Sequence, residues 1–540
     1  MAIRTGKVIM AKNIKLDKSY NNVLSYTEQQ MVSLLTSNAV ETFTDCSFLR
    51  QGENAIKLDM AYNNAIKCNY IGFQNPDYSN KWFFGFIDEV EYVSNGTVIV
   101  RYTIDEFSTW WDYWQPEECF VEREHAMDDT PGANLVPEQL ELGEYVKNGP
   151  HEQVTFDDLQ GGCIAVMSPY DPDGQTTWYS TMVNGIPVSG CITFYTDLPN
   201  FKEAMKSYAQ HGQADTITAV YLVPGGLVDF TNDCTVMHQG TVNEYYLYNG
   251  SNNPKQQDFH ILPRPDSLGG SAIFQPVNGK MYTYPYVGIV LHNYAGSSNV
   301  LAYEYFENPT DPVIRSKGSL NVGCSIISYP LNYKGWPSNY LEGISCGKFP
   351  TLSWSADLYT NWLTQNAVNN AIGVGGGLLD IGMGIASAAA GGESGGEAIG
   401  SGIREIFNVA HEIYQHALVP VASRGNVNQG DLFSGDKNNT IFAQSVSITA
   451  QFARRIDKYF TRFGYQTNET KIPNQMGRTY WNFVKIAPGE DIGHSTSSDY
   501  FSVPTKSMET INQIYQRGVT IWHDHTNIGN YSLSNTIVSS

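Results

Sequence analysis

The sequence predicts a mainly β fold, with sheet-like regions at both ends of the chain. Three observations lead to this prediction. Aromatic residues make up 13% of the 540 residues and charged residues only 16%, against about 25% charged in an ordinary soluble domain. Many of the aromatic side chains are Tyr and Trp, which favour strands over helices. Clusters of Gly, Pro and Asn divide the chain into short segments, as is typical of strands joined by turns.

The length of the chain allows several domains. At roughly 100–200 residues per domain, 540 residues correspond to about three to five modules. We place boundaries where the composition changes and expect four parts. These are an N-terminal β part over residues 1–130, inserted β domains over 131–355, an apolar loop with a helix over 356–437, and a C-terminal β part over 438–540.

The N-terminal part, which reads as sheet, contains the clearest hairpin of the sequence. An apolar run from Trp82 to Val90 leads to Asn95-Gly96, after which Val98–Ile104 alternate between apolar and polar side chains. Asn-Gly readily accepts the two positive φ angles of a type I′ turn. We therefore predict two strands joined by a type I′ turn.

The middle part, residues 131–355, is predicted as one or two β domains. Apolar runs such as Thr216–Val223 and Tyr286–Leu291 fit buried strands, and turn clusters such as Pro224-Gly225-Gly226 separate them. Within this part, only Asn200–His211 has a helical pattern.

Residues 371–392 form an apolar Gly/Ala segment with a single charge, Asp380. A helix of this length could span the ~30 Å hydrocarbon core of a bilayer. Each Gly costs about 1 kcal/mol of helix propensity, and a charge at the bilayer centre costs roughly 2.5–3.5 kcal/mol. We therefore expect a segment that is sheltered in one state and inserts in another. A flexible Gly-rich loop, or a helix hairpin buried in an oligomer, is the alternative.

An amphipathic helix and a second sheet region are expected after the apolar segment. Apolar residues from Ile399 to Ala417 recur at helical spacing, and Pro420 ends the pattern. Residues Phe442–Phe452 alternate like a strand, and Val519–Trp522 form a last apolar strand.

The chain is strongly acidic, with a formal net charge of −21. Between Phe86 and Tyr145, 15 acidic residues stand against Arg101 and Arg123, a local net charge of 2 − 15 = −13. An acidic protein gains no counterion-release affinity for nucleic acid, but a negative wall suits a channel through which DNA passes without sticking. A solvated acidic face is the more ordinary reading, and a calcium site is the third.

No motif predicts an enzyme, a cofactor or a metal centre. The GxSxG, HExxH and Walker patterns are absent. His523-Asp524-His525 is a possible metal pair without a third ligand nearby, and a polar turn is the favoured reading. The pairs Glu117-Glu118 and Asp128-Asp129 could suit a glycosidase, but any acidic chain contains such pairs. The eight cysteines form no CxxC pair and read as scattered small hydrophobic residues.

Several stretches at both ends of the chain are similar to one viral family. They are Asn75–Phe83, Ile104-Asp105, Thr109-Trp110, Phe120–His125, Phe452–Arg455, Phe463–Tyr465, Gly518–His523 and Asn527–Ser532. Taken together and in this order, they resemble the tail-knob or distal tail-tube proteins of small short-tailed bacteriophages of the picovirus group. The middle part shows no such match.

The resemblance implies a β-rich tail-tube domain built from the two chain ends, with inserted β domains and a long apolar loop. It further implies a homohexamer at the distal end of the tail, in contact with upper tail or collar proteins and other tail proteins, around a lumen for phage DNA. The loops would plug the tube and then open the host cytoplasmic membrane. The loop residues expected to act on the membrane are Ala371, Ile372, Val374, Leu378, Leu379, Asp380, Ile381, Met383, Ile385, Ala388 and Ala389.

Five acidic residues are the candidates for lining the channel. They are Asp88, Glu89, Glu91, Asp105 and Glu106. Two other functions stay open: a receptor-binding or adhesin module, because the Tyr-, Trp- and Asn-rich middle part would suit stacking on sugars, and a cell-wall-degrading tail protein, for which no catalytic residues are found.

Overall fold

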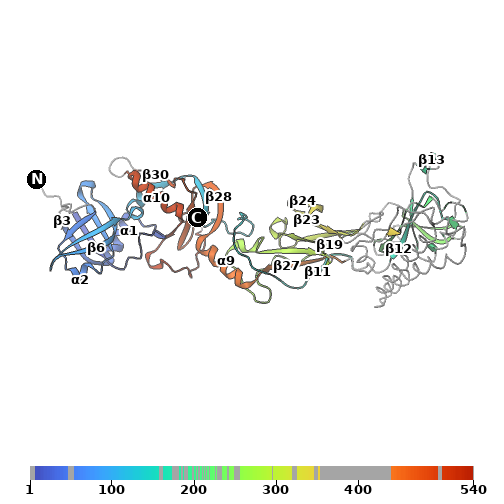
Figure 1. Cartoon of the computed structure of the whole chain (residues 1–540), viewed down its shortest axis with the longest axis horizontal. Helices are drawn as coiled ribbons and strands as arrows, with labels where there is room; N and C mark the ends of the chain where they lie inside the picture. The colour runs from blue at the N-terminus through green and yellow to red at the C-terminus, as the bar shows by residue number, and fades with distance from the viewer. Residues whose placement is uncertain are drawn as a thin grey trace, which may run out of the picture. The chain divides into compact units, whose positions relative to one another are not determined.

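The computed structural model describes residues 6–46, 54–156, 256–294, 296–318, 325–345, 351–352, 440–496 and 502–538, and parts of 162–248. The chain divides into two compact units (Figure 1). Unit 1 comprises Met1–Glu144, Phe274–Thr283 and Thr449–Ser540, and unit 2 comprises Tyr145–Ile273 and Tyr284–Ile448.

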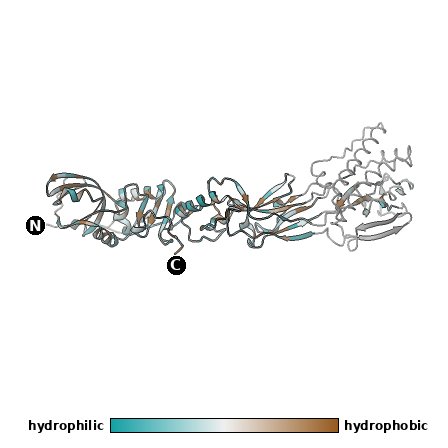
Figure 2. Ribbon diagram, turned by 90° about the horizontal axis from the view of Figure 1, so that it is seen from below, coloured by the Kyte–Doolittle hydropathy of each residue, from teal (hydrophilic) through white to brown (hydrophobic). Residues whose placement is uncertain are grey.

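A six-stranded antiparallel sheet in the order β3-β1-β5-β6-β7-β4 builds the N-terminal part of unit 1. Neighbouring residues of β1, such as Val8 and Ile9, belong to two different buried clusters, because successive side chains of a strand point to opposite faces. Hydrophobic and hydrophilic residues are interspersed along these strands (Figure 2). The strands are β1 (Gly6–Ala11), β3 (Ala39–Cys46), β4 (Ala55–Leu58), β5 (Tyr70–Asn75), β6 (Lys81–Ser94) and β7 (Thr97–Ile104).

Three helices interrupt the sheet that the sequence predicted for residues 1–130. They are α1 (Glu28–Ser37), α2 (Tyr62–Ala65) and α3 (Glu106–Trp110). Helix α1 starts with a capping box, in which the Thr27 side chain accepts from the Gln30 backbone and the Gln30 side chain from that of Thr27. Its residues Met31 and Leu35 are fully buried. The helix has only 10 residues and buries only these two, so its sequence shows only a weak helical repeat of apolar residues.

The predicted hairpin forms from β6 and β7, with Ser94 paired to Thr97. Neither Asn95 nor Gly96 has a positive φ angle, so the turn is not of type I′ and that part of the prediction was wrong. The pairing is irregular on both sides of Glu89–Tyr92. Such bulges change the twist of the strands and the geometry that the turn must fit.

A second sheet brings the two chain ends together. Its order is β2-β31-β29-β9-β28, and β2 pairs in parallel with β31 across nearly the whole sequence. Trp481 and Trp522 are fully buried there, with ring centroids 5.1 Å apart. The bounds are β2 (Asn22–Leu24), β9 (Cys119–Glu124), β28 (Tyr465–Lys471), β29 (Trp481–Ile486) and β31 (Val519–Trp522), with a separate pair β8 (Trp114–Pro116) and β30 (Gly493–Ser495).

Two long helices of unit 1 were not expected from the sequence. They are α9 (Ala450–Phe463) and α10 (Thr505–Arg517), and α10 packs on β29 and α3 (Figure 1). The predicted strand over Phe442–Phe452 was too long, because strand β27 (Phe442–Ile448) ends before α9 begins. The alternating pattern runs on into Ala450 and Phe452, whereas the buried helix face consists of Ala453, Ile456 and Phe460 at helical spacing.

Unit 2 contains three larger antiparallel sheets and a two-stranded one. Their orders are β10-β27-β20-β21 with β11 beside β27, β19-β22-β23-β24 with β25 beside β23, β17-β18-β15-β12-β16-β26, and β13-β14. The predicted strands at Thr216–Val223 and Tyr286–Leu291 appear as β16 and β20. Of the helix predicted over Asn200–His211, the described residues up to Tyr208 are helical, whereas His211 lies in a turn.

The remaining strands are β10 (Tyr145–Lys147), β11 (Glu152–Gln153), β12 (Gly162–Ser168), β13 (Met182–Val183), β14 (Ile186–Pro187), β15 (Ile192–Thr196), β16 (Ala219–Pro224), β17 (Cys234–Gln239), β18 (Val242–Tyr248), β19 (Gln256–His260), β20 (Val287–His292), β21 (Ser298–Leu301), β22 (Val313–Lys317), β23 (Ile327–Tyr333), β24 (Trp336–Ser338), β25 (Ile344–Ser345) and β26 (Thr351–Leu352). Short 3₁₀ turns include η5 (Gly279–Tyr282), η6 (Tyr303–Tyr305) and η7 (Tyr340–Glu342). The mainly β prediction is confirmed, while the four-part division of the chain stays a prediction.

A glycine at the end of α9 generates a prediction about the stability of unit 1. Gly464 has a φ of +65°, and a Cβ atom there would lie 2.0 Å from the backbone oxygen of Glu124 on β9. Gly529 has a φ of +86° but open space around it. Both Gly→Ala changes place Ala at a positive φ, which costs about 1–3 kcal/mol. Gly464→Ala should lose about 1–3 kcal/mol more, because its ψ of −153° belongs to a region that essentially only Gly adopts and because of the clash.

Thermal unfolding followed by Trp fluorescence measures the difference. Gly464→Ala should lower the melting temperature clearly more than Gly529→Ala, which serves as the matched control. Equal shifts for the two variants would mean that α9 and β9 do not approach as closely as described.

Candidate functional site

Three of the proposed channel-lining residues lie on β6 and have basic neighbours. Asp88 forms an ion pair with Lys18, and Glu89 and Glu91 lie 3.6 and 3.3 Å from the Arg101 guanidinium on β7. The Glu89 and Glu91 side chains are 66% and 48% exposed. Three negative and two positive charges leave a net of −1. This patch is therefore solvent-exposed in the chain and carries a net charge of −1 instead of the −3 of its three carboxylates alone.

Asp105, another predicted lining residue, is buried within unit 1 rather than exposed like Glu89 and Glu91. The side chain is 2% exposed. It accepts hydrogen bonds from the Tyr70 hydroxyl at 2.6 Å and from the Ser108 backbone and hydroxyl at 3.1 and 2.8 Å, and so caps helix α3. Burial raises its pKa. A count of acidic residues along the chain cannot distinguish such a cap from an exposed charge.

Glu106, the fifth candidate, is only partly exposed. Its carboxylate accepts a hydrogen bond from the Trp110 indole at 3.1 Å, and burial raises its pKa. If Glu106 lines a channel, its carboxylate faces the lumen while it still accepts the hydrogen bond from Trp110. Its role, like those of Asp88, Glu89 and Glu91, stays a prediction.

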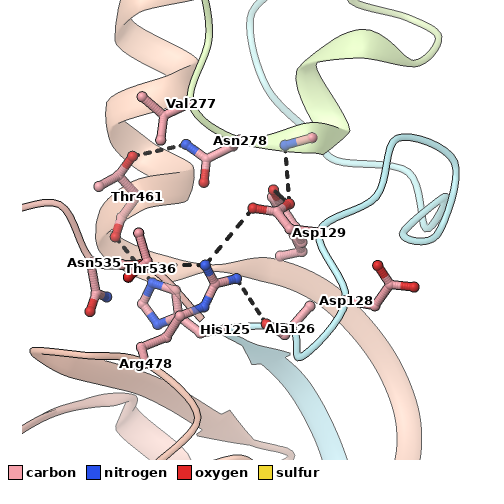
Figure 3. Close-up of polar contacts among 12 residues, drawn as sticks. His125, Ala126, Asp128, Asp129, Val277, Asn278, Thr461, Arg478, Asn535 and Thr536 are labelled. Carbon is pink, nitrogen blue, oxygen red and sulfur yellow. Dashed lines mark hydrogen bonds and ion pairs between the residues drawn. The ribbon is translucent and has the colours of Figure 1, made fainter. Parts of the chain in front are cut away.

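A buried polar network in unit 1 joins three distant parts of the chain (Figure 3). Asp457 on α9, which is 5% exposed, accepts hydrogen bonds from the Val277 and Asn278 backbones, both at 3.1 Å, and from the Asn278 amide at 2.9 Å. The Asn278 amide also donates to the Thr461 hydroxyl at 2.8 Å. Helix α9 thus holds the segment 274–283, which lies in the middle of the sequence.

Asp129 binds the same segment from the N-terminal side. Its carboxylate accepts hydrogen bonds from the Gly279 backbone at 3.0 Å and from the Tyr465 hydroxyl, and lies 3.9 Å from Arg478. Burial raises the pKa of Asp129 despite these partners. Its neighbour Asp128 points away from this cluster (Figure 3), so the two do not act as a carboxylate pair.

Glu138 completes the network with two cations. Its side chain is 1% exposed and binds Lys280 at 2.9 Å and also Arg123. Together, Asp129, Asp457 and Glu138 balance Arg123, Lys280 and Arg478, all in unit 1. Buried charges are tolerated when they are paired and hydrogen-bonded, and removing one partner is strongly destabilising. The network is therefore a structural lock on segment 274–283 rather than a reactive centre.

His125, at the centre of Figure 3, is a neutral histidine whose tautomer follows from its partners. It is 3% exposed. The Phe483 backbone N–H donates to Nδ1 at 2.8 Å, and Nε2 lies 3.1 Å from the Thr461 carbonyl oxygen. Since a carbonyl only accepts, Nε2 carries the hydrogen. Burial lowers the pKa of His125 to about 3, with Arg478 adding to the effect.

The His523-Asp524-His525 motif is engaged with protein groups. The ring of His523 lies 3.0 Å from the Ser25 hydroxyl and 3.1 Å from the Asn482 amide oxygen, so both nitrogens have partners. His525 Nε2 accepts from the Lys15 backbone at 3.2 Å. No cluster of three potential metal ligands occurs among the residues that the structure describes. These contacts agree with the favoured reading of a polar turn.

The membrane-active candidates Ala371–Ala389 and the helix expected at Ile399–Ala417 lie outside the described residues. Among the residues that are described, no helix is both long and apolar enough to cross a bilayer.

The buried network of Asp457, Asp129 and Glu138 was not predicted from the sequence. One signal was available: Asp457 stands four residues after Ala453 and three before Phe460, on the apolar face of a helix. A carboxylate at such a position needs buried partners. Its main partner, Asn278, is 179 residues away and carries no local pattern.

The comparisons with known proteins identify relatives for nearly the whole chain. The family description of the C-terminal domain of the tail knob protein gp9 of Bacillus phage phi29 matches residues 249–536, and that of the caudoviral major tail protein N-terminus matches residues 4–115. The chain is 24% identical to tail knob protein gp9 of Bacillus phage phi29 over 567 residues, which cover 90% of both chains. It is 20% identical to gp9 of Bacillus phage B103, over 97% of both chains.

A solved structure shows a similar fold. The tail knob protein gp12 of bacteriophage C1 superimposes with a TM-score of 0.55 at 14% identity, over 99% of this chain and 100% of that one. The relatives are thus named after a part of the virion and not after an enzymatic activity, as the sequence led us to expect.

The neutral state of His125 predicts a loss of stability in acid. Its ordinary pKa of 6.5 is lowered to about 3 on folding. Between these two pH values His125 is therefore protonated in the unfolded chain and neutral in the folded chain. The free energy of unfolding is therefore unaffected by His125 above pH 6.5 and decreases as the pH falls from 6.5 toward 3. Between pH 7 and pH 5 this single residue should cost about 2 kcal/mol of unfolding free energy.

The variant His125→Gln, which keeps a donor and an acceptor, should lose that part of the pH dependence. Unfolding in denaturant at pH 7 and pH 5 measures it, and His494→Gln, an exposed histidine of the same unit, is the control. The buried carboxyls Asp105 and Asp129, with raised pKa values, act in the opposite direction, so the comparison is between variants. An unchanged pH dependence in His125→Gln would contradict a neutral, buried His125.

Proposed function

The chain belongs to the tail knob protein family of short-tailed bacteriophages and is a structural component of the virion tail, and we propose that six copies of it form the distal tube through which phage DNA leaves. The observation that carries the proposal is the family match over residues 249–536. This match covers the inserted β region from residue 249 onward and the C-terminal strands. As a tail component the chain contacts other tail proteins and copies of itself, with the upper tail or collar as the proposed neighbour.

The pairing of the chain ends supports a tube-forming role for unit 1. Strands β2, β9, β28, β29 and β31 come from both ends of the sequence and share one sheet. A closed ring of such units would leave few strand edges free, which would otherwise promote aggregation. The hexamer number itself comes from the resemblance and is part of the proposal.

The acidic charge supports a lumen that does not retain DNA. A hexamer would carry 6 × (−21) = −126 formal charges. A like-charged wall repels the phosphate backbone within the Debye length of about 8 Å at physiological salt. Glu89 and Glu91 are the exposed candidates that remain best placed to contribute, because Asp105 is buried.

The apolar segment 371–402 is the proposed membrane-opening element. Transfer of about 400 Å² of apolar surface from water is worth about 10 kcal/mol at ~25 cal/mol per Å². This gain exceeds the roughly 2.5–3.5 kcal/mol for inserting the Asp380 carboxylate. We propose that symmetry copies shield these segments at the distal end until contact with the host cytoplasmic membrane releases them.

Deleting residues 371–402 should separate assembly from membrane activity. The deleted protein should still form rings in electron micrographs and the same oligomer in light scattering, but it should no longer release dye from liposomes. The Asp380→Asn variant should release the same amount of dye at neutral pH and at acidic pH, because replacing the carboxylate removes the need for its protonation. Leakage by the deleted protein equal to that of the intact one would place membrane opening elsewhere in the chain.

Charge reversal on β6 tests the lumen wall. Glu89→Lys/Glu91→Lys should slow DNA ejection in vitro, because four charge units change in each of six copies, while ring assembly persists. Glu509→Lys, on the exposed side of α10, is the control for a general charge effect. An ejection rate unaltered by the β6 double variant would remove β6 from the lumen.

A further inference from the structure

Unit 2 contains a surface pocket that the tube role does not use. Its volume is about 570 Å³, within the roughly 300–1,000 Å³ typical of ligand sites. Two short stretches line it, Glu304–Glu307 before β22 and the end of the β23–β24 hairpin, namely Asn332 and Lys334–Pro337.

The walls of the pocket are held by backbone hydrogen bonds. The Glu307 N–H donates to the Asn332 carbonyl and the Lys334 N–H to the Tyr305 carbonyl, both at 2.9 Å. Tyr333 pairs with Trp336 across a two-residue turn. Lys334 and Gly335 in that turn have φ angles of 54° and 76°, the signs that a type I′ turn requires. The hairpin therefore presents Trp336 from a fixed backbone.

Two aromatic side chains of the pocket face solvent. Trp336 is 66% exposed and Tyr305 is 42% exposed. Tyr305 stands edge-on to the buried ring of Tyr333 at 6.0 Å, whereas the Trp336 indole, in contrast to its backbone, has no ring contact or hydrogen bond with any other residue that the structure describes. The exposed indole on this turn therefore offers an aromatic face beside the polar groups of the pocket, and an aromatic face of this kind can pack against an apolar ligand face.

The polar groups of the pocket include two that are unused. The Glu307 carboxylate and the Asn332 side-chain amide bind no other group in the described part of the chain. Lys334, in contrast, pairs with Glu342 and lies 5.3 and 5.4 Å from the centres of the Tyr305 and Tyr333 rings. The pocket thus offers the Glu307 carboxylate as an acceptor, the Asn332 amide and the exposed ring of Trp336. Its cation, Lys334, is already paired with Glu342.

We propose that this pocket binds a neutral glycan. One face of a pyranose ring presents C–H groups that pack on an indole, and its hydroxyls donate to carboxylates and exchange hydrogen bonds with amides. Polyanions such as phosphate-containing polymers are disfavoured, because Glu304 and Glu307 both line the pocket and Lys334 is paired. The proposal adds a recognition role to the tail component and does not depend on the tube or the membrane segment.

Binding of tri-N-acetylglucosamine and maltotriose to the purified full-length protein tests the proposal by calorimetry. At least one of them should bind, and Trp336→Ala should weaken that binding about tenfold or more, as for a central aromatic anchor. Trp336→Phe should retain part of the affinity, and Glu307→Gln should weaken it as well. Leu341→Ala is the matched control, since Leu341 is 96% exposed, lies next to Glu342 and does not line the pocket.

The outcomes separate the glycan from other ligands. Circular dichroism and melting temperatures of the variants show whether they remain folded. No binding of either oligosaccharide at millimolar concentration, equal binding by Trp336→Ala, or binding only of poly(glycerol phosphate) or of a proline-rich peptide would overturn the proposal.

Discussion

Unit 1 depends on the pairing of strands from the two ends of the chain. Strands β2 and β9 contribute from the first quarter of the sequence, and β28, β29 and β31 from its last 80 residues. Neither group can bury its apolar face alone. Trp481 and Trp522 contact each other in the shared core and are fully buried. Unit 2, which comprises Tyr145–Ile273 and Tyr284–Ile448, is therefore inserted in the sequence between the two groups of strands.

The buried polar network extends this principle from strands to a single loop. Segment 274–283 leaves unit 2 and returns to it, and Asp457, Asp129 and Glu138 bind it within unit 1. Such buried charges give little net stability when compared with apolar packing, but they are intolerant of wrong partners. The network thus specifies which segment lies there. His125, which contacts Thr461 on the same helix as Asp457, must itself stay neutral to keep its two hydrogen bonds.

The two units expose different kinds of side chain. In unit 1, acidic side chains on β6 are partly balanced by Lys18 and Arg101, so the patch is weakly rather than strongly negative. In unit 2, exposed aromatic residues gather around a pocket on the β23–β24 hairpin. In the proposed function, the surface of unit 1 would not retain the passing DNA, and the pocket of unit 2 would bind a glycan.

The sequence by itself determined the mainly β class, the β6–β7 hairpin, the last strand and the family, because these follow from local patterns of apolar residues and short motifs. It did not determine helix α9, since the alternation of Phe442–Ile448 runs on into Ala450 and Phe452 and conceals the start of the helix. It placed Asp105 in a channel, whereas the fold uses this residue as a buried helix cap beside Tyr70. Only the tertiary structure decided that Asp129 and Asp457 meet segment 274–283. Their burial and charge balance arise from contacts between residues far apart in the chain, which no local pattern records.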